Sequence, residues 1–323
     1  MFESTTTFLL ISLLTIWSTL QVNAGFVHDA FYYVRTVQRR QHDSNNNLLL
    51  SAFSTKTNFI EGKCPPYLAI ITETDACDSD KRVDETFDTI RKAIGDNNEN
   101  GIDLISIRVS NPNPNIDNDH QRRLIDLAKR IMTMKEEIIS KQSKINDFVV
   151  VINDNVIAAV ESNVDGVHVK ESKVSEMTQI RNLLLESKMN KSMNDKSKHR
   201  VIIGTSAHCI DSAIATWNEH SPDYFFIGTC YETQSHPEKG LSDLEGPELP
   251  GKVKKTIMKG ILERDLPRSP AIFAIGGINE DNCSEPVRKY GADGVAVIRS
   301  VMQAIEPRDV VLTIKEKMQG TKK

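Results

Sequence analysis

Two short groups of residues near the C-terminus have the types and spacing needed to bind an anion. Gly276 and Gly277 directly follow an apolar run, and Arg299 and Ser300 follow the next one. Adjacent glycines let backbone N–H groups approach a ligand because no Cβ intervenes, and a guanidinium and a hydroxyl both donate to phosphate oxygens. The glycine pair could form only a turn, but Arg299 and Ser300 one strand-helix unit later favour a phosphate site.

The segments around these residues indicate what positions them. The apolar runs 271–275 and 294–298 enclose a polar segment with helix signals, 280–290, which predicts strand, tight turn, helix and parallel strand. Six earlier apolar runs predict strands at 67–72, 102–109, 148–152, 166–169, 201–204 and 224–228. Helical patterns accompany them at about 81–94, 119–141, 154–162, 173–186, 208–219, 252–264 and 307–318.

Eight strand-helix units are the number that a closed parallel barrel requires. A doubly wound open sheet would also alternate strands and helices, but it needs fewer strands and a crossover that reverses direction. We therefore predict an α/β fold, the (β/α)8 or TIM barrel. Chemistry in such barrels gathers at the C-terminal ends of the strands, and phosphate commonly binds to the loops after the last two strands.

Polar residues that follow the other predicted strands complete a candidate site at this rim. Each also has a purely structural explanation, since an Asn-Asp pair or a serine can cap a helix and an arginine can close a salt bridge. Their convergence favours binding of anionic groups at more than one place. His168, on an alternating strand, is interpreted as a core histidine. The candidate residues are Arg108, Asn153, Asp154, Ser206, Thr233 and Ser235.

Length and composition limit the alternatives. At 323 residues the chain is longer than a typical barrel of about 250 residues, so one barrel and an appendage fit. The net charge of −4 gives no basic field for nucleic acid. The cysteines are odd in number and form no C-x-x-C pair, which argues against a disulfide scaffold or a cysteine-ligated zinc site and favours a reducing compartment. They are Cys64, Cys77, Cys209, Cys230 and Cys283.

The N-terminal segment has the features of a targeting sequence. An apolar run from Phe8 to Trp17, followed by small residues before Ala24, predicts a cleaved signal peptide at 1–24, too short to span a bilayer of about 30 Å comfortably. Residues 25–63 resemble a transit peptide or disordered linker, and the barrel is assigned to 64–323. With Phe26 near the cut, this order resembles the bipartite presequence of plastids acquired by secondary endosymbiosis. We expect a plastid location; ordinary secretion is the alternative.

Six motifs, in order, resemble those of thiamine phosphate synthase and its sister, the thiazole tautomerase (TenI-like) group. The resemblance runs from about residue 67 to 317 and so covers the whole predicted barrel. Single motifs such as Gly-Ala-Asp-Gly-Val are common in barrels, but the ordered set is specific to this superfamily. The motifs are Phe148–Asp154, Asp165–Val169, Gly204–His208, Asp223–Gly228, Ala274–Ile278 and Gly291–Val297.

The resemblance implies a transferase that joins a pyrimidine diphosphate to a thiazole monophosphate and releases diphosphate, with Mg²⁺ on the leaving group. It further implies that Arg108 and Ser206 contact the diphosphate, that Asn153 holds the pyrimidine substrate and that Asp154 ligates Mg²⁺. The thiazole phosphate would then face Thr233 and Ser235, with Gly277 and Ile298 completing its backbone cradle, next to Gly276, Arg299 and Ser300 of the phosphate site predicted above. The implied partners are small phosphorylated substrates, with no nucleic acid, no stable membrane anchor after cleavage, and homo-oligomerisation left open.

Several positions depart from the family pattern. Ser110 and His236 stand where the synthases have lysines, and Arg299 stands where they have serine. Lys173 replaces the second magnesium carboxylate, although Asp154 with the substrate diphosphate could still hold Mg²⁺. Lys170 or Lys173 could instead supply the cationic stabilisation.

Three hypotheses follow from these residues. The first is a synthase-type transferase with a weakened metal site. The second is a tautomerase-like isomerase in which Cys230 or His236 moves the proton, because the histidine that this group places after Gly228 is Thr229 here. The third is a catalytically silent barrel that binds a phosphorylated thiazole or pyrimidine.

Overall fold

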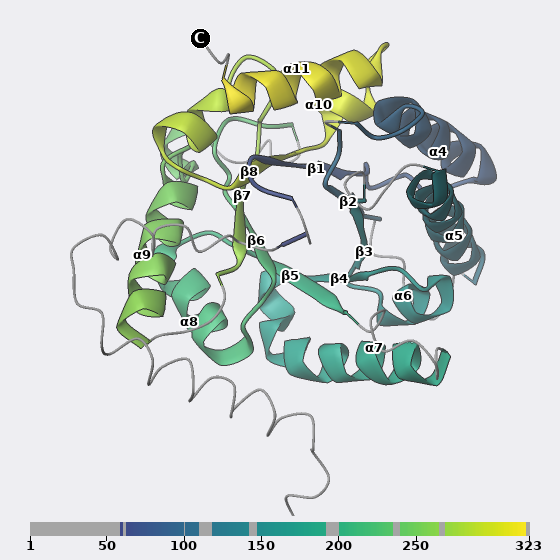
Figure 1. Ribbon diagram of the computed structural model, residues 1–323, viewed down its shortest axis with the longest axis horizontal. Helices are drawn as coiled ribbons and strands as arrows, with labels where there is room; N and C mark the ends of the chain where they lie inside the picture. Colours follow the sequence, from purple (N-terminus) through teal and green to yellow (C-terminus); the bar gives the residue numbers. More distant parts are fainter. Residues whose placement is uncertain are drawn as a thin grey trace, which may run out of the picture. The chain divides into compact units, whose positions relative to one another are not determined.

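Eight parallel strands close into a barrel in chain order, with the last strand paired to the first (Figure 1). The computed structural model describes residues 59–60, 63–99, 101–109, 118–141, 147–191, 200–234, 240–264 and 269–320. The strands are β1 (Tyr67–Ile71), β2 (Leu104–Ile107), β3 (Val149–Asn153), β4 (Gly166–Val169), β5 (Ile202–Ala207), β6 (Tyr224–Ile227), β7 (Ala271–Ile275) and β8 (Gly294–Val297). The predicted α/β TIM barrel is confirmed.

Continuous apolar sequence explains why these segments become parallel strands. Nearly every strand residue is buried, because one face packs inside the barrel and the other against the helices. Side chains alternate between these faces along each strand. Inside the barrel, toward the N-terminal ends of the strands, the side chains are aromatic. The rings of Tyr67, Tyr224 and Phe273 pack around that of Phe59.

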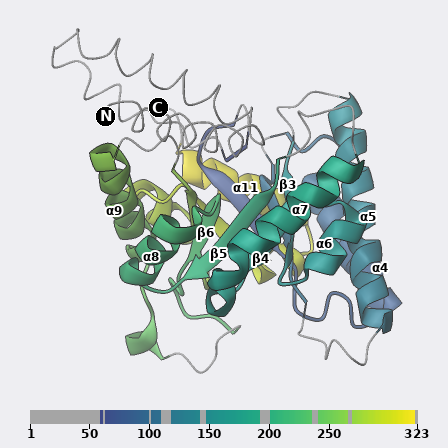
Figure 2. The same ribbon diagram turned by 90° about the horizontal axis from the view of Figure 1, so that it is seen from below.

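Helices surround the barrel and cover the outer face of the strands (Figures 1 and 2). They are amphipathic where long: Val83, Ile90 and Ile94 of the first one face the core, and its N-terminus is capped by Ser79, which accepts a hydrogen bond from the Arg82 N–H. The α-helices are α4 (Asp80–Ile94), α5 (Asn118–Lys141), α6 (Val156–Ser162), α7 (Met177–Lys191), α8 (Ile210–His220), α9 (Leu249–Arg264), α10 (Arg299–Met302) and α11 (Pro307–Gln319).

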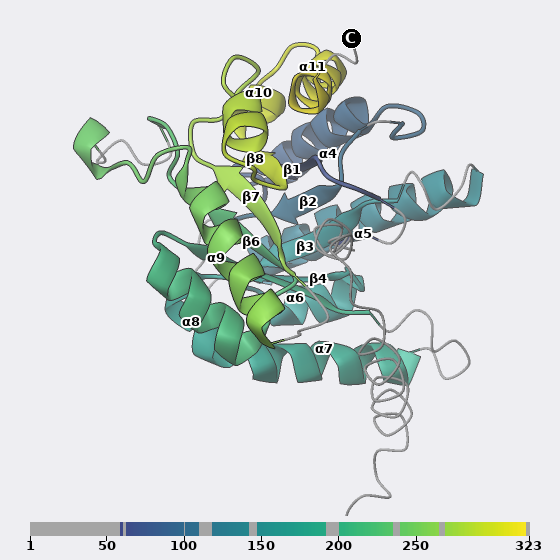
Figure 3. The ribbon, with the colours of Figure 1, turned by 60° about the vertical axis from the view of Figure 1, so that its left-hand side comes forward.

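Two segments differ from their predicted helices, and one observed helix was not predicted. The predicted helix 280–290 is instead a series of turns followed by one π-helical turn, η5 (Glu285–Lys289), which contains Pro286. The predicted helix 173–186 begins only at residue 177, after a 3₁₀ segment, η2 (Glu171–Glu176). The helix α10 was not predicted; it directly follows β8 and lies beside α11 (Figure 3). A further 3₁₀ turn, η4 (Leu241–Asp243), lies between β6 and α9.

Four aspartates, which we call the basal aspartates, tie the N-terminal ends of the strands together. Each directly precedes an even-numbered strand and accepts a hydrogen bond, at 2.7 to 2.9 Å, from the second N–H of the strand before it. Each also pairs with a cation from a helix or a terminal segment. The pairs are Asp103 with Lys63 and Lys315, Asp165 with Lys135, Asp223 with Arg181, and Asp293 with Lys254.

The described chain begins just ahead of β1 with Phe59 and Ile60, whose side chains are 2% and 4% exposed and pack into the barrel interior. The predicted domain boundary at residue 64 stays a prediction, although this buried pair lies on its N-terminal side. The predicted signal peptide, 1–24, lies outside the described residues. No described helix combines the length and apolar character needed to cross a membrane.

Candidate functional site

A cavity of about 1070 Å³ lies at the C-terminal end of the barrel, among the strand ends and the loops that follow them. Ser235 lies outside the described residues, and Asp154 is not among the residues that line the cavity. Nine other residues from the predicted site do line it: Arg108, Asn153, Ser206, Thr233, Gly276, Gly277, Ile298, Arg299 and Ser300. Residues that are up to 192 positions apart, Arg108 and Ser300, thus line one cavity.

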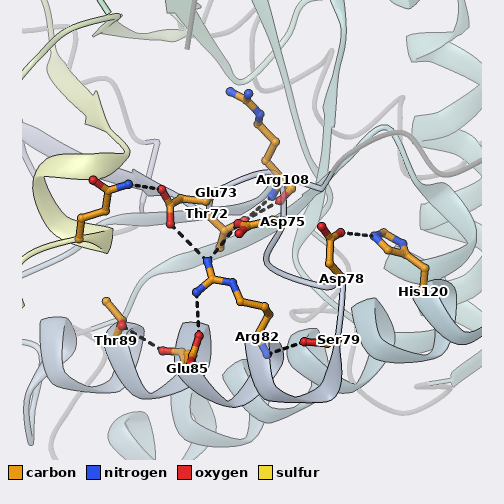
Figure 4. Close-up of polar contacts among 11 residues, drawn as sticks. Thr72, Glu73, Asp75, Asp78, Ser79, Arg82, Glu85, Thr89, Arg108 and His120 are labelled. Carbon is orange, nitrogen blue, oxygen red and sulfur yellow. Dashed lines mark hydrogen bonds and ion pairs between the residues drawn. The ribbon is translucent and has the colours of Figure 1, made fainter. Parts of the chain in front are cut away.

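Arg108 brings a half-buried positive charge to this cavity. Its backbone is held by Thr72, whose hydroxyl accepts a hydrogen bond from the Arg108 N–H at 2.8 Å and donates one to the Arg108 carbonyl at 2.7 Å (Figure 4). Burial, and then the charge of Arg299, lower the pKa of Arg108. Both effects disfavour the charged form, and a bound anion would offset them.

Nearby carboxylates are engaged by a different arginine. Arg82 of α4 pairs with Glu73, Asp75 and Glu85 at 3.4, 3.0 and 2.8 Å. Figure 4 shows the Arg108 side chain pointing away from this cluster. Among the described residues, no carboxylate lies within ion-pair distance of the Arg108 guanidinium, so this charge is available to a ligand.

Arg299 and the two glycines form a second part of the lining, on strand ends across β1 from Arg108. The Arg299 Nη2 donates to the Thr233 hydroxyl at 2.9 Å, which joins the loop after β6 to the start of α10. Gly276 and Gly277 have φ values of +98° and +64°, and a Cβ on Gly277 would lie 2.3 Å from the Glu232 carbonyl oxygen. Only glycine suits this position, because the two loop backbones pass too close for a side chain.

Ser206 belongs to a buried hydrogen-bonded chain. The His168 imidazole contacts the Ser206 hydroxyl at 3.0 Å through Nε2 and the Tyr224 hydroxyl at 3.1 Å through Nδ1. Gly204 lies between His168 and Tyr224 in the strand register, and a Cβ there would fall 1.9 Å from the tyrosine ring. Burial lowers the pKa of His168 to about 3, so the imidazole is neutral at physiological pH and orients the serine without carrying charge.

Sequence reasoning assigned His168 only to the core. The residue is indeed 4% exposed, yet its ring also lines the cavity. Thr72 and Tyr224 were missed altogether. Thr72 ends the first predicted strand and therefore lies at the rim, which was a usable signal. Nothing local to Tyr224 indicates that its hydroxyl reaches His168, since that contact depends on Gly204 of the strand between them.

Asn153 and its neighbour Asp154 have different surroundings. The Asn153 side-chain oxygen accepts a hydrogen bond from the Ser106 hydroxyl at 2.5 Å, which leaves its amide N–H groups as the remaining donors in the cavity lining. Asp154 has a φ of +58° and a side chain that is 7% exposed. Its Oδ2 atom lies 3.2 Å from Lys170 Nζ and 3.4 Å from Lys173 Nζ, with the geometry of ion pairs rather than hydrogen bonds.

The surroundings of Asp154 do not fit a magnesium ion. Mg²⁺ requires oxygen ligands in a near-octahedral shell at about 2.0–2.1 Å. The one carboxylate here already faces two ammonium groups, and the Lys170 N–H donates to its other oxygen at 3.2 Å. The described residues include no group of three His, Cys, Asp or Glu side chains that could hold a metal ion. The predicted magnesium role of Asp154 is therefore not supported by its donor set.

The proton carriers proposed for an isomerase have little support. Cys230 is 2% exposed, and burial raises the pKa of its thiol to about 12, which keeps it protonated at neutral pH. His236 lies outside the described residues. His208 lines the cavity between Glu245, at 3.3 Å from Nδ1, and Glu171, at 3.8 Å from Nε2.

Comparisons with known proteins identify thiamine-phosphate synthases as relatives. A curated thiamine-phosphate synthase from Bacillus licheniformis is 28% identical over 172 residues, which cover 53% of this chain and 64% of the relative. The synthase from Geobacillus thermodenitrificans is 32% identical over 158 residues, 49% of this chain and 58% of the relative. The chain thus spans less than two thirds of the length of these relatives.

Solved structures support the fold. A thiamine phosphate pyrophosphorylase from Pyrococcus furiosus has a TM-score of 0.52 and 21% identity, covering 78% of this chain and 95% of its own. A ribulose-1,5-bisphosphate carboxylase/oxygenase from Pyrococcus horikoshii has a TM-score of 0.54 at 13% identity, covering 82% and 61%. At these identities the likeness concerns the barrel alone. The family model described as thiamine monophosphate synthase matches residues 68–301, and the chain therefore belongs to that family.

Proposed function

We propose that this protein makes thiamine phosphate by joining a hydroxymethylpyrimidine diphosphate to a thiazole phosphate. Membership of the thiamine monophosphate synthase family supports the reaction type. The observation that carries the proposal is the cavity in which Arg108 and Arg299 face the same space. Two guanidiniums that line one cavity are suited to a site that receives two phosphorylated groups.

The reaction requires positioning and charge stabilisation and no protein nucleophile. The bond between the pyrimidine methylene carbon and the diphosphate oxygen breaks, and the electron pair leaves with the diphosphate. The thiazole nitrogen then donates its lone pair to the methylene carbon, forming the new C–N bond without any oxidation or reduction. The protein must hold the two substrates in line and stabilise the negative charge that accumulates on the leaving group.

The residues of the cavity can be assigned to these tasks. Arg108 takes the diphosphate, and Ser206, oriented by neutral His168, donates to it. Asn153 donates its amide to the pyrimidine substrate. On the other side, Arg299 and Thr233, already hydrogen-bonded to each other, face the thiazole phosphate together with the backbone of Gly277. Ser235, Gly276, Ile298 and Ser300 complete this second subsite as proposed from the sequence.

The test is a synthase assay on the full chain with both phosphorylated substrates, measuring thiamine phosphate and released diphosphate in equal amounts. We expect turnover that is lost when either substrate is omitted. Product from the thiazole carboxylate alone would identify an isomerase instead. Thermal stabilisation by the thiazole phosphate without turnover in either assay would identify the silent binder.

The proposed location is a plastid reached through the N-terminal signal and transit-like segments. It rests on the order of those segments in the sequence and on cysteine usage. A fluorescent protein fused after residue 63 tests it, since secretion of the fusion would contradict a plastid address.

A further inference from the structure

The side chains around Asp154 form a small cluster of unusual charge. One carboxylate, 7% exposed, lies between the ammonium groups of Lys170 and Lys173, whose side chains are 48% and 42% exposed. The cluster therefore has an excess of one positive charge. We call it the lysine clamp. Among the described residues, Asp154 is the ion-pair partner of both lysines.

The charge of the lysine clamp disfavours binding of a free divalent cation. A magnesium ion on Asp154 Oδ2 would lie about 2.1 Å from that oxygen and hence within about 6 Å of both ammonium nitrogens. It would be repelled by two positive charges and attracted by one negative charge. The ammonium groups, in contrast, already compensate the charge of the buried carboxylate, and no metal ion has to lose its hydration water.

The same charge suits an anion. Each ammonium group has three N–H donors, so donors remain on both lysines after the contact with Asp154. Lys170 has extended backbone angles and follows His168 by two residues, which places both side chains on the same side of the strand. The His168 ring lines the cavity, whereas Asp154, Lys170 and Lys173 are not among its lining residues, so the clamp adjoins the mouth beside His168. Asn153, also in the lining, directly precedes Asp154.

We propose that the lysine clamp takes the place of magnesium, so that Lys170 and Lys173 bind the diphosphate group of the pyrimidine substrate directly. Asp154 then serves as a positioning residue, which holds the two ammonium groups together before the substrate arrives. This inference rests on the proposed function for the identity of the diphosphate ester. The binding of a diphosphate group without a divalent metal can be tested independently of turnover.

The first experiment measures metal binding by the full chain with calorimetric titrations of MgCl₂ and MnCl₂ alone. We expect no saturable site in the wild type. The substitution Lys173→Asp places a second carboxylate beside Asp154 and removes one positive charge, so we expect it to gain a saturable site for Mn²⁺. A one-to-one site in the wild type overturns the proposal, as does failure of Lys173→Asp to gain one while it remains folded by circular dichroism.

The second experiment measures binding of inorganic diphosphate with a chelator present, by the shift of the thermal midpoint. We expect stabilisation of the wild type that weakens by about tenfold in apparent affinity in Lys170→Gln and in Lys173→Gln, the scale of one lost charged hydrogen bond. Lys173→Arg keeps the charge and should retain binding. Lys259→Gln, an exposed lysine of α9, is the matched control and should match the wild type.

The outcomes separate this inference from the proposed function. If diphosphate stabilises the chain only with Mg²⁺ present, the proposed role of the lysine clamp is contradicted, even if the chain makes thiamine phosphate. If diphosphate binds through both lysines in the presence of chelator but no thiamine phosphate forms, the role of the lysine clamp is supported and the synthase proposal is contradicted. In an active enzyme we further expect chelator to leave turnover unchanged in the wild type and to lower it in Lys173→Asp.

Discussion

The two ends of the barrel differ in whether their buried charges have partners within the fold. At the N-terminal end, every basal aspartate has both a backbone N–H and a cation as partners. At the C-terminal end, Arg108 and Arg299 line the same cavity, and burial together with the charge of Arg299 lowers the pKa of Arg108. The first arrangement satisfies its charges within the fold. In the second, no carboxylate of the described residues lies within ion-pair distance of Arg108, so its charge is left to a ligand.

The contrast separates residues that stabilise from residues that act. Removing one partner from a compensated buried pair leaves an isolated charge and lowers stability. Removing a repelled arginine relieves strain in the free protein and costs only ligand binding or turnover. Substitutions at the two ends should therefore have opposite signatures in unfolding and in activity assays.

The largest effect on stability is expected at the base. Lys254→Ala leaves Asp293, which is 1% exposed, without its cation, and we expect a loss of about 3 kcal/mol in the free energy of unfolding, measured with chemical denaturant. Lys259→Ala on the same helix, exposed at 79%, should change it little. Adding Asp293→Asn to Lys254→Ala should restore part of the loss. An unchanged unfolding curve in Lys254→Ala would show that the base is not the compensated region described here.

The next effect is expected at the mouth and concerns activity. Arg108→Ala should lower kcat/KM by about 10² to 10³-fold, or about 2.7–4 kcal/mol, because a cation on the leaving group is lost. Its thermal midpoint should be equal to or above that of the wild type, because burial and Arg299 both oppose the charge. Arg91→Ala, an exposed arginine on α4, is the control. A midpoint well below the wild type would place Arg108 among the stabilising residues.

A pH dependence follows from the neutral His168. The unfolded chain protonates this residue below about pH 6.5, whereas the folded imidazole stays neutral until its pKa of about 3. Protonation of His168 therefore does not reduce the free energy of unfolding above pH 6.5. As the pH drops from 6.5 toward 3, this free energy falls by about 1.4 kcal/mol per pH unit. Unfolding at pH 7 and pH 5 measures this. His168→Gln should show a smaller difference between the two; an equal difference would refute the assignment.

The smallest effect is expected for the support of Arg108. Thr72→Val removes both hydrogen bonds that fix the Arg108 backbone while keeping a side chain of similar shape. We expect a loss of about 1 kcal/mol in transition-state binding, measured as kcat/KM, with intact folding. Thr256→Val, an exposed threonine of α9 whose hydroxyl bonds only within its own helix, is the matched control. Equal activities in the two variants would exclude a role for Thr72.

The fold was predictable because eight apolar runs at strand length, separated by helical patterns, admit few arrangements. Errors arose where local chemistry competed with periodicity. The segment 280–290 contains Pro286 and forms turns and a π-helical turn in place of the expected helix. The strand β2 is shorter than the predicted strand 102–109. Asp103 serves as a basal aspartate before the strand begins, and Arg108 lies at the rim after it ends.

The candidate site was predictable in position and only partly in its contacts. Once the barrel was assumed, residues after the strands had to meet at one rim, and nine of them do line the cavity. Contacts across intervening strands are not encoded in local spacing. The His168 chain depends on Gly204 making room for a tyrosine ring, and the ion pairs of Asp154 depend on the rotamers of two long lysines.

The ring of Phe59 has a consequence for where the folded unit begins. Its centroid lies 5.5 to 5.7 Å from those of Tyr67, Tyr224 and Phe273 inside the barrel. A chain that began at residue 64 would lack this ring and would expose the aromatic side chains that surround it. We therefore expect the intact barrel to require residues upstream of the predicted boundary at residue 64.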